Sequence, residues 1–258
     1  EPRAPSPEAG DLARDLFLSP RSCDEMVAAA RQRGQLLLVG PPASGKTHVA
    51  RRLAIYLAGH EERVLFLRMH PEARYADLLG EPGAGRGWVR ELCERARDDR
   101  SQTYVLVLDE LDRGDAARAL GEFVGGLSER GQRLRLSASG APFEVPRNLV
   151  VVGTARGLPH DPALVGRFPV VRQPADSLVL GRFLAACRPG MNWVADLHQA
   201  LNRRLADQGH SLRVGHGLFM LPDLDVASVR GIWAREVLPL LEAHGVDLAG
   251  FSYEALRP

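Results

Sequence analysis

The chain has 258 residues, of which 45% are hydrophobic and 25% are charged, a composition typical of a globular protein with one large or two small domains. Its net charge of +1 provides no overall field that would attract nucleic acid or a membrane surface, and no apolar run reaches the roughly 20 residues that span a bilayer. The cysteines Cys23, Cys93 and Cys187 lack metal-ligand spacing, so we interpret them as reduced thiols and expect a cytoplasmic protein without a membrane segment.

The first eight residues are rich in proline, at Pro2, Pro5 and Pro7. This composition is typical of an extended linker, and we predict a linker over residues 1–11. The first residue is glutamate. We expect either the C-terminal part of a longer polypeptide or a trimmed N-terminus, and the sequence leaves both open.

Apolar runs alternate with helical patterns up to residue 175. We predict a helix from Asp24 to Arg33, capped by Ser22 and ended by Gly34. Residues 132–145 alternate around a Ser-Gly pair and predict a β-hairpin. Further strands are expected at 35–39, 63–68, 104–109, 149–153 and 168–171, and further helices at 46–58, 88–98 and 115–127.

This alternation predicts an α/β domain over residues 12–175, with a parallel sheet covered by helices on both faces. After it, helical patterns follow one another at 178–187, 191–208 and 226–244. They predict a small helical lid domain over residues 176–258.

The strand expected at 35–39 is followed at once by a glycine loop. Its sequence, Gly-Pro-Pro-Ala-Ser-Gly-Lys-Thr, fits the phosphate-binding pattern G-x-x-x-x-G-K-[ST]. Lys46 is the chain's single lysine among 33 basic residues, and a compact ammonium reaches between phosphates better than a guanidinium does. We predict a nucleoside triphosphate site, GTP or ATP, formed by Gly40, Pro41, Pro42, Ala43, Ser44, Gly45, Lys46, Thr47 and His48.

An acidic pair, Asp109-Glu110, ends the strand expected at 104–109. Downstream of a phosphate loop, such an Asp holds Mg²⁺ together with the loop hydroxyl, here Thr47, and the following Glu polarises the attacking water. We therefore predict Thr47 and Asp109 as the Mg²⁺ residues and Glu110 as the catalytic base. An ordinary acidic strand end is the alternative.

Arginines add further candidates. Arg167 precedes the strand expected at 168–171, from which it is predicted to reach a neighbouring subunit's nucleotide and stabilise transition-state charge. Arg156 follows the strand expected at 149–153 and either faces the γ-phosphate or caps a loop. Arg130, Arg133 and Arg135 lie on or beside the hairpin, and we interpret them as a solvated charged face, since no aromatic residues are interleaved as a nucleic-acid surface would require.

Several further segments resemble, in order, those of the McrB family of AAA+ NTPases, the motors of methylation-dependent restriction systems. The resemblance covers most of residues 12–242. It implies a three-layer αβα P-loop fold with a C-terminal helical lid. It also implies a hexameric homo-oligomer ring that hydrolyses GTP or ATP with Mg²⁺ and powers an McrC-like nuclease subunit, so that DNA is contacted indirectly. The segments are Met69-His70-Pro71 with Tyr75-Ala-Asp77, Leu108 to Gly114, Gly121-Glu122-Phe123, Ser139 to Leu149, and Val214 to Met220 with Trp233 to Leu241.

The chain departs from the family pattern after the fourth strand, in the turn after the third, and before the fifth, where the family's three arginines are reduced to Gly166-Arg167. Arg156 replaces the asparagine expected to position the lytic water, and Asp112 stands where the family has asparagine. These departures keep open a hydrolysis-impaired, nucleotide-dependent switch or scaffold. A MoxR-like remodelling chaperone is a further alternative, against which the segments at 69–77 and 214–220 argue.

Overall fold

The computed structural model describes residues 9–83, 85–159 and 161–256. By their contacts these residues form two compact units. The first combines the chain up to Val39 with Lys46–Arg172, and the second combines Gly40–Gly45 with the chain from Gln173 on. The predicted boundary after residue 175 therefore lies three residues past this division, and the grouping of the glycine loop with the lid was not predicted.

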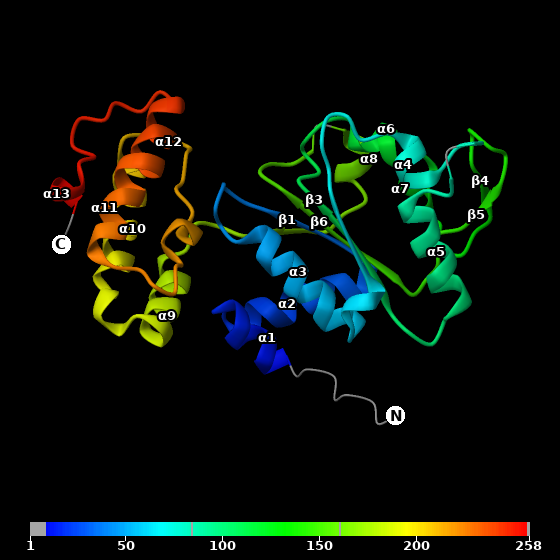
Figure 1. Cartoon of the computed structure of the whole chain (residues 1–258), viewed down its shortest axis with the longest axis horizontal. Coiled ribbons are helices and arrows are strands. Elements are labelled where there is room, and N and C mark those ends of the chain that lie inside the picture. Colours follow the sequence, from blue (N-terminus) through cyan, green and yellow to red (C-terminus); the bar gives the residue numbers. More distant parts are fainter. Residues whose placement is uncertain (1–8, 84, 160, 257–258) are drawn as a thin grey trace. The chain divides into compact units, whose positions relative to one another are not determined.

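A five-stranded parallel sheet lies at the centre of the first unit (Figure 1). Its strand order is β2-β3-β6-β1-β7. The predicted parallel sheet is confirmed, with β6 running two residues further than expected and β7 beginning two residues later. The strands are β1 (Gln35–Val39), β2 (Val64–Arg68), β3 (Tyr104–Asp109), β6 (Leu149–Ala155) and β7 (Val170–Arg172).

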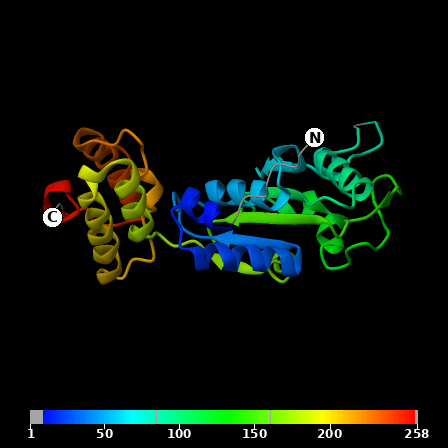
Figure 2. The same ribbon diagram turned by 90° about the horizontal axis from the view of Figure 1, so that it is seen from below.

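Helices cover both faces of this sheet (Figures 1 and 2). Because successive strand residues point to opposite faces, Leu36 and Leu38 of β1 join one core cluster while Leu37 and Val39 join the other. The result is the predicted three-layer αβα arrangement. On the first face lie α1 (Ala9–Leu16), α2 (Pro20–Arg33) and α3 (Lys46–Ala58), and on the second α4 (Tyr75–Leu79), α5 (Trp88–Asp98), α6 (Ala116–Leu120), α7 (Glu122–Gly126) and α8 (Pro162–Val165).

In the N-terminal region the predicted start of one helix and the predicted end of the linker were wrong. Helix α2 begins at Pro20, with Ser19 as its N-cap, because proline at the first helical position has no N–H to leave unpaired. Its end at Gly34 is confirmed, in a left-handed conformation with φ 69°. The last three residues of the predicted 1–11 linker belong to α1, and residues 1–8 lie outside the described part.

The helix expected at 115–127 is two short helices, α6 and α7, which meet at Gly121. Gly121 has a φ of 46°, and a Cβ atom there would lie 2.6 Å from the Tyr75 ring. A left-handed residue interrupts an α-helix, so the single-helix prediction was wrong at this residue.

The predicted hairpin is present as the antiparallel pair β4 (Leu134–Arg135) and β5 (Pro142–Phe143). The solvated-face interpretation was wrong for Arg130. Its guanidinium donates to the carbonyls of Gly34 at 2.8 Å and Pro146 at 3.3 Å, and burial lowers its pKa to about 10. Arg130 therefore ties the segment before the hairpin to the start of β1.

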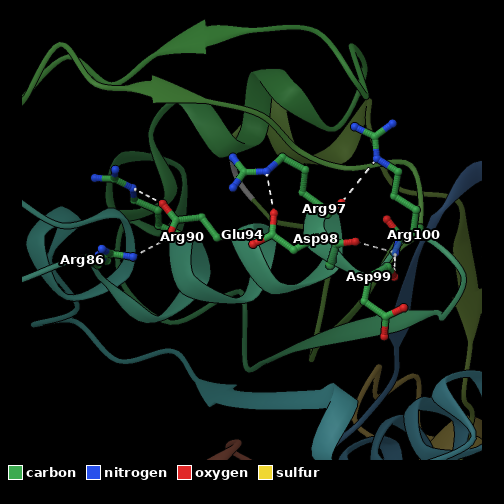
Figure 3. Close-up of polar contacts among 9 residues, drawn as sticks. Arg86, Arg90, Glu94, Arg97, Asp98, Asp99 and Arg100 are labelled. Carbon is green, nitrogen blue, oxygen red and sulfur yellow. Dashed lines mark hydrogen bonds and ion pairs between the residues drawn. The ribbon is translucent and has the colours of Figure 1, made fainter.

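Ion pairs lie on and beside α5 (Figure 3). Glu94 accepts from Arg86 at 3.1 Å and from Arg90 at 3.0 Å. The Arg90–Glu94 pair spans one helical turn, a spacing that stabilises a helix modestly.

A 3₁₀ turn, η1 (Glu61–Arg63), precedes β2.

The second unit is helical apart from its loops. A buried row of Leu197, Leu201 and Leu205 on α10 forms part of its core. The helix expected at 226–244 contains a π-turn, η4 (Trp233–Val237), just before Pro239, which cannot donate the regular helical hydrogen bond. The other elements are α9 (Ser177–Cys187), η2 (Pro189–Met191), α10 (Trp193–Asp207), η3 (His216–Phe219), α11 (Val226–Ile232), α12 (Leu238–Ala243) and α13 (Tyr253–Leu256).

No helix within the described ranges, 9–83, 85–159 and 161–256, is long and apolar enough to cross a membrane.

Candidate nucleotide-binding site

Asp109, at the end of β3, is the centre of a polar cluster in the first unit and is fully buried. Its Oδ1 accepts from the hydroxyls of Thr47 at 2.8 Å and Thr154 at 2.7 Å, and its Oδ2 accepts from Arg68 Nε at 3.2 Å. Parallel pairing places Arg68 opposite Asp109 and Leu108 opposite Gly153. The carboxyl ends of β2, β3 and β6 therefore meet at the start of α3.

Thr47 and Asp109 were predicted as the Mg²⁺ residues, and the structure brings their oxygens together. A hydroxyl and a carboxylate are hard oxygen ligands of the kind that Mg²⁺ prefers. Because the two oxygens already lie within hydrogen-bond distance, this donor pair fits the metal. Residues 47 and 109 would hold it, and bound Mg²⁺ would neutralise phosphate charge.

Glu110 follows in a left-handed conformation with φ 60°, which is uncommon for a residue other than glycine and costs of order 1 kcal/mol or more. Its N–H donates to Thr154 Oγ1 at 2.9 Å, and the N–H of Leu111 donates to the Thr154 carbonyl at 2.8 Å. These bonds hold the turn against its strain. Such strain is typical of functional sites.

The Glu110 side chain is 33% exposed. Its Oε2 lies 3.2 Å from Arg113 Nε in an ion pair, although the pair lacks the alignment of a hydrogen bond. A third of the side chain is thus exposed to solvent, although Oε2 itself is buried.

Two residues of this cluster, Thr154 and Arg68, were given no role by sequence reasoning. Thr154 is a buried polar residue in an otherwise apolar strand, and that pattern is a usable signal because buried polar side chains need a partner. Arg68 ends a predicted strand, but its contact depends on strand order, which the sequence does not give.

The glycine loop contacts the lid within the second unit. Ala43 and Gly45 have φ values of 56° and 80°, and the Ala43 carbonyl accepts from the N–H of Gly217 at 2.8 Å. A Cβ atom on Gly215 would lie 2.2 Å from the Ala43 carbonyl carbon. The backbone of segment 215–217 therefore packs directly against the backbone of the loop. At position 215 this approach leaves no room for a side chain, so the residue must be glycine.

His216, between these glycines, is buried and directed at the loop. Its Nδ1 accepts the backbone N–H of Asp176 at 3.1 Å, so in the neutral ring Nε2 carries the proton. A Cβ atom built on Gly45 would lie 3.8 Å from that Nε2. Burial lowers the pKa of His216 to about 4, which keeps the ring neutral at pH 7 as an N–H donor facing the loop.

Lys46 begins α3 and is half-buried. Burial lowers the pKa of its ammonium, while the carboxylates of Asp112 and Asp109 act in the opposite direction. The side chain therefore lies near both acids. His48, which was included in the predicted loop site, is exposed.

The two candidate arginines differ in their contacts. Arg167 donates through Nη1 to the Ala163 carbonyl at 2.6 Å, and its own carbonyl accepts from Gln35 at 2.9 Å. Arg156 donates through Nε to Asp112 Oδ2 at 3.0 Å. Among the described residues, no interaction of Arg167 involves the Asp109 cluster, whereas Arg156 is joined to a turn three residues past Asp109.

Comparison with protein families gives two matches. The model of the AAA domain, dynein-related subfamily, matches residues 35–205, which is more than half of the chain. The chain belongs to this family. The model of the McrB alpha-helical lid domain matches residues 194–248. This AAA+ chain is thus of the McrB type, which confirms the resemblance found in the sequence.

The chain is similar to known proteins of two kinds. The chain is 25% identical to the type IV methyl-directed restriction enzyme EcoKMcrB subunit of Escherichia coli over 92% of its length, which covers 59% of that protein. It is 32% identical to the ATP-dependent zinc metalloprotease FtsH 2 of Sorangium cellulosum over 85% of its length, which covers 38% of that protein. The chain therefore spans less than two thirds of either relative.

Proposed function

We propose that this chain is a nucleoside triphosphatase that hydrolyses GTP or ATP with Mg²⁺. The observation that carries the proposal is that Thr47 and Thr154 both donate hydrogen bonds of 2.7–2.8 Å to Asp109. Thr47 is the last residue of the phosphate-binding motif, and the chain has an AAA+ fold. Lys46 and the backbone of the loop would bind the phosphates. Names of relatives that include ATP dependence support testing ATP beside GTP.

In this proposal each residue of the strand-end cluster has one task. Asp109 and Thr47 hold Mg²⁺, and Thr154 fixes the Asp109 carboxylate and the backbone of Glu110 at once. Glu110 accepts a proton from the attacking water. Arg167 acts on the nucleotide of a neighbouring subunit.

We extend the proposal to the assembly on the strength of the McrB relative. The chain would form a homo-oligomer ring, a hexamer, and power an McrC-like nuclease subunit in the cytoplasm. It would contact DNA through that partner. The similarity to a restriction subunit and the lid match support this part.

A second candidate is a switch that binds nucleotide and turns it over slowly. The ion pair between Arg156 and Asp112 at 3.0 Å favours it, because neither residue can do what the family's asparagines do. An asparagine side chain both donates and accepts hydrogen bonds, whereas guanidinium only donates.

The deciding experiment measures release of inorganic phosphate from GTP and from ATP, with and without a co-encoded partner, for the parent and Glu110→Gln. Titration calorimetry measures the binding of both nucleotides to the same proteins. Hydrolysis by the parent that falls by roughly 10²–10⁴-fold in Glu110→Gln supports the triphosphatase. Tight binding without hydrolysis supports the switch. Absence of binding to either nucleotide contradicts both.

A further inference from the structure

Asp112 and Arg156, which both stand where the McrB family has asparagine, contact each other. Asp112 lies in the turn after β3, and Arg156 directly follows β6, which is the neighbouring strand. Asp112 Oδ2 accepts from the backbone N–H of Arg156 at 3.2 Å and from its Nε at 3.0 Å. One carboxylate oxygen therefore fixes both the backbone and the side-chain stem of Arg156.

The pairing with Asp112 leaves the terminal nitrogens of the Arg156 guanidinium able to donate to another group. The Arg156 side chain is 60% exposed, whereas that of Asp112 is 12% exposed. A guanidinium has five N–H groups, and among the described residues the bonds of the Arg156 side chain use only Nε. Its terminal nitrogens can still donate to an anion.

The charge of Asp112 also acts on Lys46, the proposed phosphate-binding lysine. Of the carboxylates that act on the Lys46 pKa, Asp112 has the largest effect. Its second oxygen, Oδ1, is buried without a hydrogen-bond partner in the described part of the chain. A carboxylate thus lies near two cations, and a triphosphate would compete with it for both.

We infer that Asp112 and Arg156 form one functional unit, in which Asp112 is a positioning residue that directs the Arg156 guanidinium to a phosphate oxygen of the bound nucleoside triphosphate. The inference rests on the proposed function. In the family pattern, the amide of an asparagine is expected to position the water. Arg156 would instead stabilise phosphate charge as a cation, because a guanidinium cannot accept a proton or a hydrogen bond. Without Arg156, the Asp112 carboxylate would repel the phosphates.

The test is a double-mutant cycle of the parent, Asp112→Asn, Arg156→Asn and the double variant, which carries the asparagines of the family. Asp112→Asn removes charge but keeps an acceptor oxygen for both Arg156 donors, so the turn should remain folded. For each protein, calorimetry gives the affinity for the thiophosphate analogues of GTP and ATP, and phosphate release gives kcat and KM.

We expect Asp112→Asn to bind the analogue roughly 2- to 10-fold more tightly, because a negative charge near the phosphates is lost. Its kcat should fall, because a neutral amide oxygen holds the Arg156 guanidinium more weakly than a carboxylate does. Arg156→Asn should lower kcat by up to roughly 10³-fold and weaken binding. In the Arg156→Asn variant, the further change Asp112→Asn should strengthen analogue binding by a larger factor than it does in the parent. It should leave the kcat of that variant unchanged.

A merely structural turn would respond differently. Asp112→Asn would then weaken binding and turnover together, and its effects would be the same in the parent and in the Arg156→Asn variant, which would overturn the inference. If the parent binds nucleotide without turnover, the affinities alone test the inference. Equal effects of Asp112→Asn on affinity in the parent and in the Arg156→Asn variant would then overturn it. If the parent binds neither analogue, the proposed function itself fails and this inference fails with it.

Glu94→Gln is the matched control. It removes one carboxylate charge from an ion pair on α5, between Glu94 and Arg90 at 3.0 Å, with no part in the site (Figure 3). Nucleotide affinity and kcat should equal those of the parent. An equal change in Glu94→Gln and Asp112→Asn would show a general effect of charge and count against the inference.

Discussion

The Thr47 hydroxyl donates to Asp109 Oδ1 at 2.8 Å across a sequence separation of 62 residues. This bond joins the first turn of α3, where the phosphate-binding motif ends, to the end of β3. Two motifs that the sequence supplies separately therefore form one polar cluster, with Lys46 next to Thr47. Lys46, the proposed phosphate-binding residue, is thus adjacent to one of the two proposed Mg²⁺ residues.

Lys46→Ala should lose nucleotide binding, because it removes the ammonium from the phosphate loop. The expected weakening for GTP and ATP is at least roughly 10-fold, the scale of a hydrogen bond to a charged group. Lys46→Arg should also impair binding, since guanidinium is larger and planar. Titration calorimetry measures both variants. Exposed Arg31→Ala is the control for loss of one positive charge, and parent-like affinity in Lys46→Ala would contradict the phosphate-site assignment.

Gly215→Ala should distort the phosphate loop. The new methyl would lie 2.2 Å from the Ala43 carbonyl carbon, so the backbone must shift at a cost typical of overpacking, about 1–3 kcal/mol. If that cost is expressed in binding, nucleotide affinity falls by roughly 5- to 100-fold. Gly190→Ala, where the methyl meets open space, is the matched control. Equal affinities for the two variants would mean that the 215–217 segment does not shape the loop.

The sequence predicted those parts of the fold that local patterns determine. The apolar runs of β1 and β3 and the phosphate loop were read correctly because each is a contiguous signal. Contacts between strands required information that the chain order lacks. Arg68 and Thr154 reach Asp109 only because β2 and β6 flank β3, and no single-sequence pattern fixes that order.

Other differences have local physical causes. Gly121 was read as one residue within a helix, although its positive φ divides that helix. Asp112 and Arg156 were each noted as departures from a family pattern, but their pairing depends on the register of β3 with β6. Asp109 and Glu110 are neighbours in the chain, and Thr47 reaches Asp109 because α3 packs against β3.

The stability of the protein should fall as the pH is lowered from 7 to 5, in part because of His216. Its folded-state pKa is lowered to about 4 by burial, whereas an unfolded histidine titrates near 6.5. Between these values the unfolded chain binds the proton and the folded chain does not. Unfolding is therefore favoured as the pH falls, by about 2 kcal/mol at pH 5 from this one group.

Urea unfolding followed by tryptophan fluorescence at pH 7 and pH 5 tests this prediction. His216→Gln should show a smaller pH-dependent loss of unfolding free energy than the parent. His198, whose pKa burial also lowers, should maintain part of the dependence in both proteins. Exposed His244→Gln is the control and should behave as the parent does. The same pH dependence in His216→Gln and the parent would contradict a neutral His216.

Arg167 is predicted to act in trans, on the nucleotide of a neighbouring subunit. Arg167→Ala should leave nucleotide affinity nearly unchanged and lower turnover by up to roughly 10³-fold, since the arginine would serve another subunit's transition state. Its side chain donates to the Ala163 carbonyl, so its loss should also loosen the end of α8 slightly. Thermal melting separates that local effect from the loss of turnover.

Mixing Arg167→Ala with Glu110→Gln subunits gives the decisive measurement. Each variant alone has a defect at every interface, but a mixed ring contains some interfaces that pair an intact Glu110 with an intact Arg167. Turnover of the mixture should therefore exceed that of either variant alone, with a maximum at intermediate ratios. Light scattering or native mass spectrometry must show that mixed assemblies form. No rescue in verified mixed assemblies would mean that Arg167 acts within its own subunit or only supports α8, and Arg156 would then be the arginine that serves the phosphate.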